Sequence, residues 1–318
     1  MKTLLITREL PQRVLEAAKS IAQVTIRADQ SPMQMAEAKQ ALSDYDMILP
    51  TLGDQFNGDV FDRASRCRLL ANFGVGYNHI DVGAAVAAGL QVSNTPGAVT
   101  DATADIALTL ILMTARRAGE GERMVRAGTW DGWHPTQLLG MHLGGRTLGI
   151  IGMGRIGKAI AKRAHFGFGM DIAYYNRSKV ADFGVPATQL GSIEAVLAAA
   201  DIVVLAVPAT PQTRHLMNAD RFAQMQRHGL LINIARGDII DEAALVAALQ
   251  SGQIAGAGLD VYEREPIVSK ELLQMENVTL LPHLGTAALN VREDMGLMAV
   301  DNIKAFLDGA PLPNGVTA

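Results

Sequence analysis

The chain contains a single cysteine, Cys67, among its 318 residues. An intramolecular disulfide and a metal site built from several cysteines are therefore excluded, and we assign no metal site. Long apolar runs are also missing, because the most apolar stretch, 104–115, is interrupted by Asp105 and is too short to span a bilayer. The first eight residues lack the apolar core of a signal peptide. We therefore expect a cytoplasmic protein that does not enter a membrane.

The chain also lacks a large excess of positive or negative charge. Charged residues make up 19% of the chain, the formal net charge is −4, and no run of basic residues occurs. We therefore expect neither a nucleic acid nor a membrane surface as a partner. Apolar residues make up 49% of the chain, which is ordinary for a globular protein. The length is sufficient for two domains, since single cores stop growing beyond about 250 residues.

Short runs rich in Val, Ile and Leu alternate with longer helical patterns along the chain. Unbroken apolar strands between helices are typical of parallel sheets that are covered on both faces. The strands fall into two successive groups, and this predicts an α/β protein with two doubly wound parallel sheets. The expected strands are 4–7, 24–27, 47–50, 69–73 and 91–93 in the first group, and 147–151, 172–175, 202–207, 230–234, 256–259 and 278–281 in the second.

A helical pattern over 100–126 links the two groups, and a last helical pattern covers 287–307. Between the first helix and the second group, the segment 127–145 has no clear periodicity and carries both tryptophans, Trp130 and Trp133. A stretch of this length without periodicity is unusual inside a compact protein. Two interpretations stay open: an arm that packs on another subunit, or a surface loop with two half-buried indoles.

The expected strand 147–151 runs directly into Gly152-Met153-Gly154-Arg155-Ile156-Gly157, and a helical pattern follows. Between a strand and a helix, these glycines are typical of a dinucleotide-binding loop. Gly152 permits the tight turn, Gly154 lets the backbone approach a pyrophosphate, and Gly157 lets the helix contact the strand closely. The N-terminus of the helix then offers N–H groups to the phosphates. A plain glycine turn is the alternative.

The next expected strand ends at Asn176-Arg177-Ser178. An NAD-binding protein would place Asp or Glu there for the ribose hydroxyls. Neutral Asn176 does not repel a 2′-phosphate, Arg177 can make charge-assisted bonds to it, and Ser178 can donate one more. The pattern favours NADP as the cofactor. The alternative is that Arg177 is a solvated loop residue and that the cofactor is NAD.

Polar side chains gather near the ends of the late strands, in the segments 233–237 (NIARG), 258–266 (GLDVYEREP) and 281–286 (LPHLGT). Ligands of open parallel sheets bind beyond the carboxyl ends of the strands, so all three segments can face one crevice. A histidine can supply a proton near neutral pH. An arginine fork suits a planar carboxylate.

The same residue types also occur in purely structural roles. His283 can be a buried structural histidine, and Arg236 can cap a strand end. Glu263 can be the carboxylate partner of the histidine in place of Glu265.

Taken together, these motifs resemble the D-isomer-specific 2-hydroxyacid dehydrogenase family, and within it the glyoxylate/hydroxypyruvate reductases. The resemblance covers essentially the whole chain. Besides the segments quoted above, it is carried by 72–81 (NFGVGYNHID) and 94–97 (NTPG). It implies an NADP-dependent enzyme that reduces a small 2-keto acid, such as glyoxylate or hydroxypyruvate, to the D-2-hydroxy acid.

The resemblance also implies a role for individual residues. Arg236 would bind the substrate carboxylate and polarise the keto oxygen, His283 would protonate that oxygen, and Glu265 would orient the histidine. The backbone amides of Val75 and Gly76 would hold the substrate carboxylate. Asp260 would bond the nicotinamide carboxamide, Val207 and Pro208 would line the adenosine side, and Thr103 and Ala235 would complete the cofactor contacts.

Two domains are expected on the same basis: a flavodoxin-like substrate domain, 1–98 with 288–318, and a Rossmann-type cofactor domain, 99–287. The resemblance further implies a homodimer with 127–145 as a candidate contact, and we hypothesise that Trp133 reaches the neighbour's active site. One alternative function is reduction of a larger acid such as 2-ketogluconate or an aryl pyruvate, which the width of the pocket around 51–53 would decide. A cofactor-sensing, corepressor-like binding protein is the other alternative.

Overall fold

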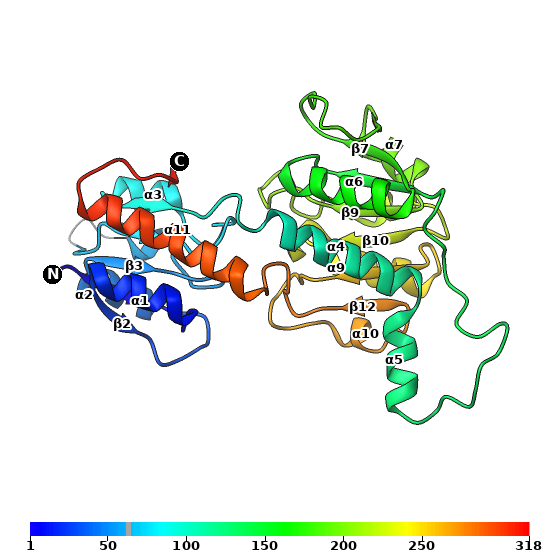
Figure 1. Ribbon diagram of the computed structural model, residues 1–318, viewed down its shortest axis with the longest axis horizontal. Coiled ribbons are helices and arrows are strands. Elements are labelled where there is room, and N and C mark those ends of the chain that lie inside the picture. The colour runs from blue at the N-terminus through cyan, green and yellow to red at the C-terminus, as the bar shows by residue number, and fades with distance from the viewer. Residues whose placement is uncertain (62–64, 318) are drawn as a thin grey trace. The chain divides into compact units, whose positions relative to one another are not determined.

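A computed structural model describes residues 1–61 and 65–317 of the chain. The chain divides into two compact units, of which the first comprises Met1–Val99 with Ala287–Ala318 and the second comprises Thr100–Thr286. Figure 1 labels many of the helices and strands. Among the described residues, no helix is both long and apolar enough to cross a membrane.

The first unit is built on a six-stranded sheet of order β13-β5-β4-β3-β1-β2. All neighbouring strands are parallel except β13, which runs antiparallel to β5. Without β13, this is the flavodoxin-like order 2-1-3-4-5, and it confirms the predicted fold class. The strands are β1 (Thr3–Ile6), β2 (Gln23–Ile26), β3 (Met47–Leu49), β4 (Leu69–Ala71), β5 (Gln91–Ser93) and β13 (Gly315–Val316).

Helices cover both faces of this sheet, as the two apolar cores of the first unit require. On one face α1 (Gln12–Ile21) lies beside α11 (Leu289–Leu307) (Figure 1). They approach closely because Gly296 has no side chain: a Cβ there would lie 2.4 Å from a methyl group of Val14. The other face carries α2 (Met35–Asp44), α3 (Val82–Ala87) and the 3-10 turn η1 (Gly58–Val60).

The second unit has a seven-stranded sheet of order β12-β11-β10-β9-β6-β7-β8. Every neighbouring pair is parallel. The order is that of a Rossmann fold with one further strand, β12, at its edge. The strands are β6 (Thr147–Ile151), β7 (Asp171–Tyr175), β8 (Ala187–Gln189), β9 (Ile202–Leu205), β10 (Leu230–Asn233), β11 (Gly256–Leu259) and β12 (Val278–Leu280).

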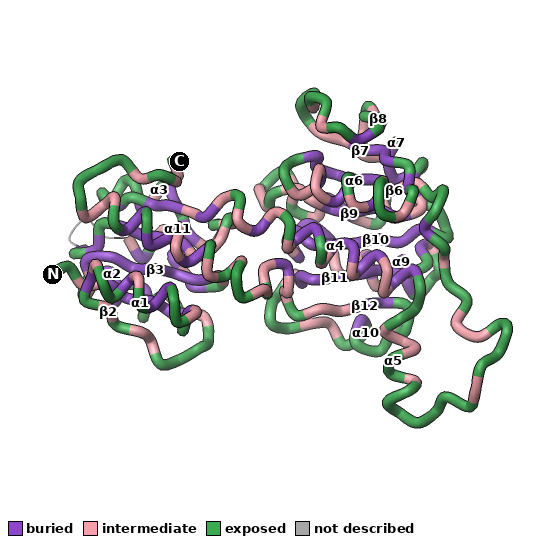
Figure 2. Tube along the Cα trace, viewed as in Figure 1, coloured by how far each residue is buried: buried purple, intermediate pink, exposed green. Residues whose placement is uncertain are grey.

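This sheet is also buried on both faces, and Figure 2 shows its central strands in the colour of buried residues. One face packs against α4 (Thr100–Ala115) and α6 (Arg155–Phe168). The other face packs against α7 (Ile193–Ala199), α8 (Ala219–Phe222), α9 (Glu242–Gln250) and α10 (Lys270–Leu273). The remaining elements are α5 (Ala118–Arg126), which has no buried residue, and the 3-10 turn η2 (Gly237–Ile239).

The prediction of one helix over 100–126 was wrong, because the segment forms the two helices α4 and α5. Arg117 lies between them with a left-handed φ of 52°. The carbonyl of Ala115 accepts a hydrogen bond from the N–H of Met141 at 2.7 Å. A Cβ at Gly140 would lie 2.2 Å from that carbonyl oxygen, so the returning chain occupies the place of a continuing helix. Two short strands, β8 and β13, were not predicted.

Candidate active site

Three adjacent parallel strands, β10, β11 and β12, end at the same edge of the second sheet. Their register aligns Asn233 with Leu259 and Leu259 with Leu280. Arg236, Glu265 and His283 lie in the segments that follow these three strands, one residue in each. The sheet therefore brings together the three segments that the sequence indicated as candidates.

His283 and Glu265 form an ion pair in which Nδ1 of the imidazole lies 2.8 Å from Oε2 of the carboxylate. The second carboxylate oxygen of Glu265 accepts the backbone N–H of Tyr262 at 3.1 Å. Burial raises the pKa of Glu265, but the hydrogen bond and charge of His283, the N–H of Tyr262 and the charge of Arg236 together outweigh it, and the net shift is downward. An ionised carboxylate therefore faces one nitrogen of the imidazole and leaves Nε2 for another partner.

The backbone of His283 is held in an unusual conformation by Asp260. His283 has a left-handed φ of 56°, which costs a non-glycine residue about 1–2 kcal/mol. Its N–H donates to the carbonyl of Asp260 at 2.9 Å. The buried carboxylate of Asp260 accepts the N–H groups of Leu284 at 2.6 Å and Gly285 at 2.8 Å. Burial raises the pKa of Asp260 against these bonds. Together, these contacts fix the backbone of His283 and thereby the direction in which its imidazole points.

Two further contacts connect the ends of the three strands. The hydroxyl of Tyr262 donates to the carbonyl of Leu281 at 2.9 Å, which links the segment of Glu265 to that of His283. Gly237 packs directly on the peptide between Tyr262 and Glu263, because a Cβ there would lie 1.8 Å from the carbonyl carbon. The segment of Arg236 is thereby pressed against the segment that carries Glu265.

Arg236 is supported from within its own segment by Asn233. The buried amide of Asn233 donates to the carbonyl of Arg236 at 2.8 Å and accepts the N–H of Ala235 at 3.0 Å. The guanidinium donates to the carbonyl of Ala235 at 2.7 Å. Burial lowers the pKa of Arg236, and the charges of Glu265 and Asp238 oppose that shift. A partly desolvated guanidinium binds an anion more strongly than one in bulk water.

Glu263, the alternative partner, does not pair with His283. It lies 3.0 Å from Nε2 of His215 and forms a separate ion pair with it. The N–H of Glu263 also donates to the carboxylate of Glu242 at 3.2 Å. The unit therefore contains two His–Glu pairs, and Glu265 belongs to the one with His283.

The glycine loop follows β6 and leads into α6 as expected. Gly152 has a φ of 101°, and a Cβ there would lie 2.6 Å from the carbonyl oxygen of Ala206. A Cβ at Gly157 would lie 2.3 Å from the carbonyl oxygen of Gly152, whereas a Cβ at Gly154 would meet none of the described atoms within 4 Å. The loop is tight at both ends and open in the middle. This shape fits a pyrophosphate that approaches the backbone at Gly154.

The end of β7 carries no acidic side chain toward the glycine loop. Asn176 accepts the N–H of Met153 at 3.2 Å through Oδ1 and donates to Ser178 at 3.0 and 3.1 Å through Nδ2. Arg177 and Ser178 are exposed beside it. A neutral amide therefore stands beside an exposed cation and a hydroxyl at the position where dinucleotide-binding sheets contact the adenosine ribose.

The other predicted cofactor residues are distributed over several segments of the second unit. Thr103, on α4, donates through its hydroxyl to the carbonyl of Gly285 at 3.2 Å and so belongs, like Asp260, to the support of the His283 segment. Val207 lies beside the glycine loop, where its methyl would be 2.8 Å from a Cβ at Gly152. The carbonyl of Pro208 accepts the hydroxyl of Thr213 at 2.7 Å. Arg155 is exposed, Ile156 is half-buried, and Ala235 is buried.

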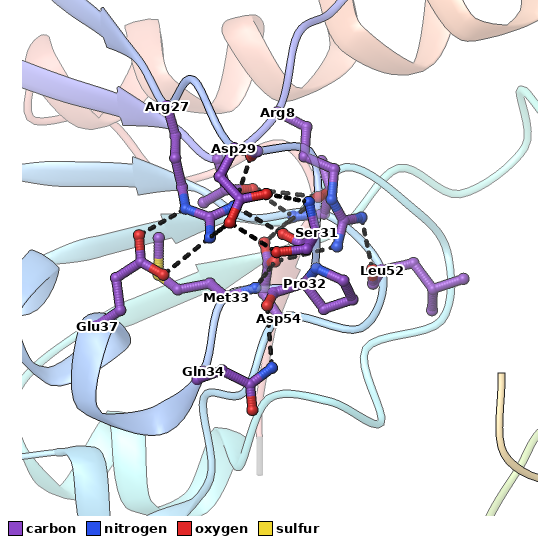
Figure 3. Close-up of polar contacts among 12 residues, drawn as sticks. Arg8, Arg27, Asp29, Ser31, Pro32, Met33, Gln34, Glu37, Leu52 and Asp54 are labelled. Carbon is purple, nitrogen blue, oxygen red and sulfur yellow. Dashed lines mark hydrogen bonds and ion pairs between the residues drawn. The ribbon is translucent and has the colours of Figure 1, made fainter. Parts of the chain in front are cut away.

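In the first unit, the carboxyl ends of β1 and β3 are connected by Arg8 (Figure 3). Its guanidinium donates to the carbonyl of Leu52 at 2.8 Å and lies 3.4 Å from the carboxylate of Asp54. Asp54 is fully buried and accepts the N–H groups of Met33 at 2.9 Å and Thr51 at 2.8 Å. The loop 51–53, which the sequence predicts to decide the width of the pocket, is therefore held by Arg8, which follows the neighbouring strand β1.

Asn233, Gly237 and Tyr262 lie within the predicted motifs, but sequence reasoning gave them no role. An asparagine directly at the end of an apolar strand is a signal for Asn233, since a buried amide there must bond to the next turn. No such signal exists for Gly237 or Tyr262, because their partners come from other strands. Among the described residues, no group of three or more His, Cys, Asp or Glu is arranged to hold a metal ion.

A Rossmann-ordered sheet with this glycine loop after its first strand defines a dinucleotide-binding class of protein. Residues 108–285 match the family described as D-isomer specific 2-hydroxyacid dehydrogenase, NAD binding domain. The chain is 42% identical over 313 residues to a glyoxylate reductase of Thermococcus kodakarensis, covering 97% of this chain and 94% of the relative. The protein therefore belongs to the D-isomer-specific 2-hydroxyacid dehydrogenase family.

Solved structures agree with this assignment. The crystal structure of the TT0316 protein from Thermus thermophilus has a TM-score of 0.92 at 40% identity and covers 99% of this chain and 100% of its own. That of an NADPH-dependent glyoxylate/hydroxypyruvate reductase from Sinorhizobium meliloti, in complex with NADP and malonate, has a TM-score of 0.87 at 37% identity, with 99% and 97% covered.

We predict that Gly157→Ala impairs both folding and cofactor binding, because the new methyl group would meet the Gly152 carbonyl oxygen at 2.3 Å. The expected loss is about 1–3 kcal/mol of unfolding free energy, as for other overpacked sites. The matched control is Gly167→Ala in the same helix, where a Cβ meets nothing within 4 Å and stability should rise by about 0.5–1 kcal/mol. Thermal unfolding and titration with NADPH measure both effects. Wild-type stability and affinity in Gly157→Ala would rule out this packing.

Proposed function

We propose that the protein reduces small 2-keto acids, glyoxylate and hydroxypyruvate, to the D-2-hydroxy acid with NADPH as the hydride donor. The observation that carries the proposal is the ion pair of His283 with Glu265 at 2.8 Å. These residues follow β12 and β11, and Arg236 follows the adjacent strand β10. The names of the relatives from Thermococcus kodakarensis and Sinorhizobium meliloti, a glyoxylate reductase and a glyoxylate/hydroxypyruvate reductase, support the same substrates.

In this proposal, Arg236 binds the substrate carboxylate and polarises the keto oxygen. His283, protonated and paired with Glu265 through Nδ1, gives a proton from Nε2 to that oxygen. Glu265 keeps the imidazole in place and favours its charged form. The backbone N–H groups of Val75 and Gly76 hold the carboxylate as an anion-binding loop. When bound, the nicotinamide supplies the hydride.

The cofactor would be held by residues of the second unit. The pyrophosphate would lie on the glycine loop at the N-terminus of α6, and the 2′-phosphate would lie against Arg177 and Ser178. The full set of proposed cofactor residues is Thr103, Gly152, Gly154, Arg155, Ile156, Gly157, Asn176, Arg177, Ser178, Val207, Pro208, Ala235 and Asp260.

The first test follows NADPH oxidation with glyoxylate and hydroxypyruvate in wild-type protein and in Glu265→Gln. We expect the variant to lose about 100-fold in kcat, as for removal of general acid–base support. The matched control is Glu263→Gln, which disrupts the other His–Glu pair and should keep most of the rate.

The pH profile adds a second readout. The pKa of Glu265 is lowered. Its carboxylate therefore stays ionised at pH values at which an ordinary glutamate is already protonated. Wild-type activity should therefore persist on acidification through pH about 4.3, where an unperturbed glutamate takes up its proton.

Equal loss in Glu265→Gln and Glu263→Gln would contradict the assigned roles. No turnover with these acids, with 2-ketogluconate or with an aryl pyruvate would contradict the function.

For the cofactor, we predict that Arg177→Ala raises the KM for NADPH about tenfold, the effect of one lost charge-assisted bond. The KM for NADH should not change, because NADH has no 2′-phosphate. Asn176→Asp can keep the acceptor for the N–H of Met153 and should shift preference toward NADH. Steady-state kinetics with both cofactors measure the ratio. Wild-type preference for NADH would remove the basis for NADP and leave the catalytic proposal in place.

We also propose a homodimer, located in the cytoplasm, in which the segment 127–145 contacts the second subunit. Trp133 is 79% exposed and Trp130 is 54% exposed, and α5 before them has no buried residue. Large exposed indoles on one segment are typical of a surface that another protein covers. This favours the arm over a loop with two half-buried indoles.

Light scattering after size-exclusion chromatography tests the arm with Trp133→Ala. We expect weaker dimerisation and, if the indole reaches the neighbour's active site, an altered preference between glyoxylate and hydroxypyruvate. Leu273→Ala is the control, since this leucine is also exposed, at 62%, but lies on α10. Unchanged dimerisation and preference in Trp133→Ala would argue against the arm.

A further inference from the structure

The loop that follows β4 has three successive carbonyl groups that are all bound by the protein itself. The carbonyl of Gly74 accepts the side-chain amide of Asn72 at 3.0 Å and the N–H of Thr95 at 3.1 Å. The carbonyl of Val75 accepts the side-chain amide of Asn94 at 2.9 Å. The carbonyl of Gly76 accepts the same amide nitrogen of Asn72 at 3.1 Å. Two asparagine side chains thus hold three consecutive peptide groups.

The direction of the carbonyls determines the direction of the N–H groups. In a trans peptide the C=O and the N–H of one unit point in opposite directions. Because the three carbonyls point toward the asparagines, the N–H groups of Val75, Gly76 and Tyr77 point away from them. Within residues 1–61 and 65–317, none of the three donates to a protein acceptor. Val75 and Tyr77 are 36% and 37% exposed, so an anion has access to this part of the loop.

We propose that Asn72 and Asn94 are positioning residues that keep these three N–H groups available for the substrate carboxylate. Successive free N–H groups in a turn form an anion-binding concavity. The inference rests on the proposed function, because the carboxylate of a 2-keto acid is the anion concerned. It adds Tyr77 as a third backbone donor and gives two buried or half-buried side chains a task in substrate affinity.

Asn72 is suited to this task as a donor. It is fully buried, and its side-chain bonds to Gly74 and Gly76 both leave from Nδ2 toward carbonyl oxygens. A flipped amide would place Oδ1 against the same two oxygens. Aspartate has the same shape but only acceptors when ionised, and it would also repel the substrate. The two bonds span two and four residues, so they shape the loop and do not connect the strands of the sheet.

The experiment compares Asn72→Asp with wild-type protein in two assays. Calorimetric titration of the NADPH complex with oxalate, which carries the carboxylates but does not react, measures anion binding without turnover. Steady-state kinetics with glyoxylate measure KM and kcat separately. We expect the oxalate affinity to fall by about 10- to 100-fold and the KM for glyoxylate to rise by the same factor. This is the effect of losing one or more hydrogen bonds to a charged group. The kcat and the affinity for NADPH should change little.

Two further variants separate positioning from stability. Asn94→Ala removes one of the three carbonyl contacts and should raise the KM less than Asn72→Asp does, which keeps the test open if Asn72→Asp does not fold. Asp46→Asn is the control: this buried carboxylate precedes β3 at the opposite end of the same sheet and binds Lys2, Thr3 and Arg66. It should lower the melting temperature and leave the oxalate affinity unchanged.

The outcomes distinguish this proposal from the function on which it rests. Loss of oxalate binding in the Asn72 and Asn94 variants but not in Asp46→Asn supports the positioning role, even if no 2-keto acid is reduced. Wild-type oxalate affinity and KM in both asparagine variants would overturn it. Failure of the wild-type protein to bind oxalate would overturn it as well.

Discussion

The buried carboxylate of Asp260 is the contact on which the arrangement at the edge of the second sheet depends. It accepts the N–H groups of Leu284 and Gly285, and the backbone carbonyl of Asp260 accepts that of His283. The left-handed backbone of His283 is stable only with such support. This backbone directs the imidazole toward Glu265. The proton transfer that we propose for His283 therefore depends on the carboxylate of Asp260, which holds the backbone beside the histidine.

The two units share one structural feature at the ends of their strands. In each, a buried polar side chain bonds to the backbone of the turn after a strand: Asn233 after β10 and Asn72 after β4. The exposed groups of the turn are then oriented before any ligand binds. Catalytic power in such sites comes from dipoles and charges that need no reorganisation during the reaction. The glycine loop meets the same requirement through close packing at Gly152 and Gly157.

Much of this could be predicted from the sequence, because apolar strands and glycine spacing are local signals. The strands 91–93, 147–151 and 256–259 have the predicted bounds. The break at Arg117 could not be predicted, since it depends on Met141 bonding to Ala115. The strands β8 and β13 are short and gain their pairing only from neighbours in the sheet. The residue types alone left Glu263 open as the partner of His283, whereas the family resemblance implied Glu265, and the structure pairs His283 with Glu265.

The most direct test of the account is the stereochemistry of the product. The purified protein is incubated with hydroxypyruvate and NADPH, and any glycerate formed is resolved by chiral chromatography. A site in which Arg236, His283 and the cofactor hold the substrate in one orientation gives a single enantiomer, and family membership predicts D-glycerate. L-glycerate or a racemic product would contradict the account, because hydride would then reach the opposite face of the keto carbon or both faces.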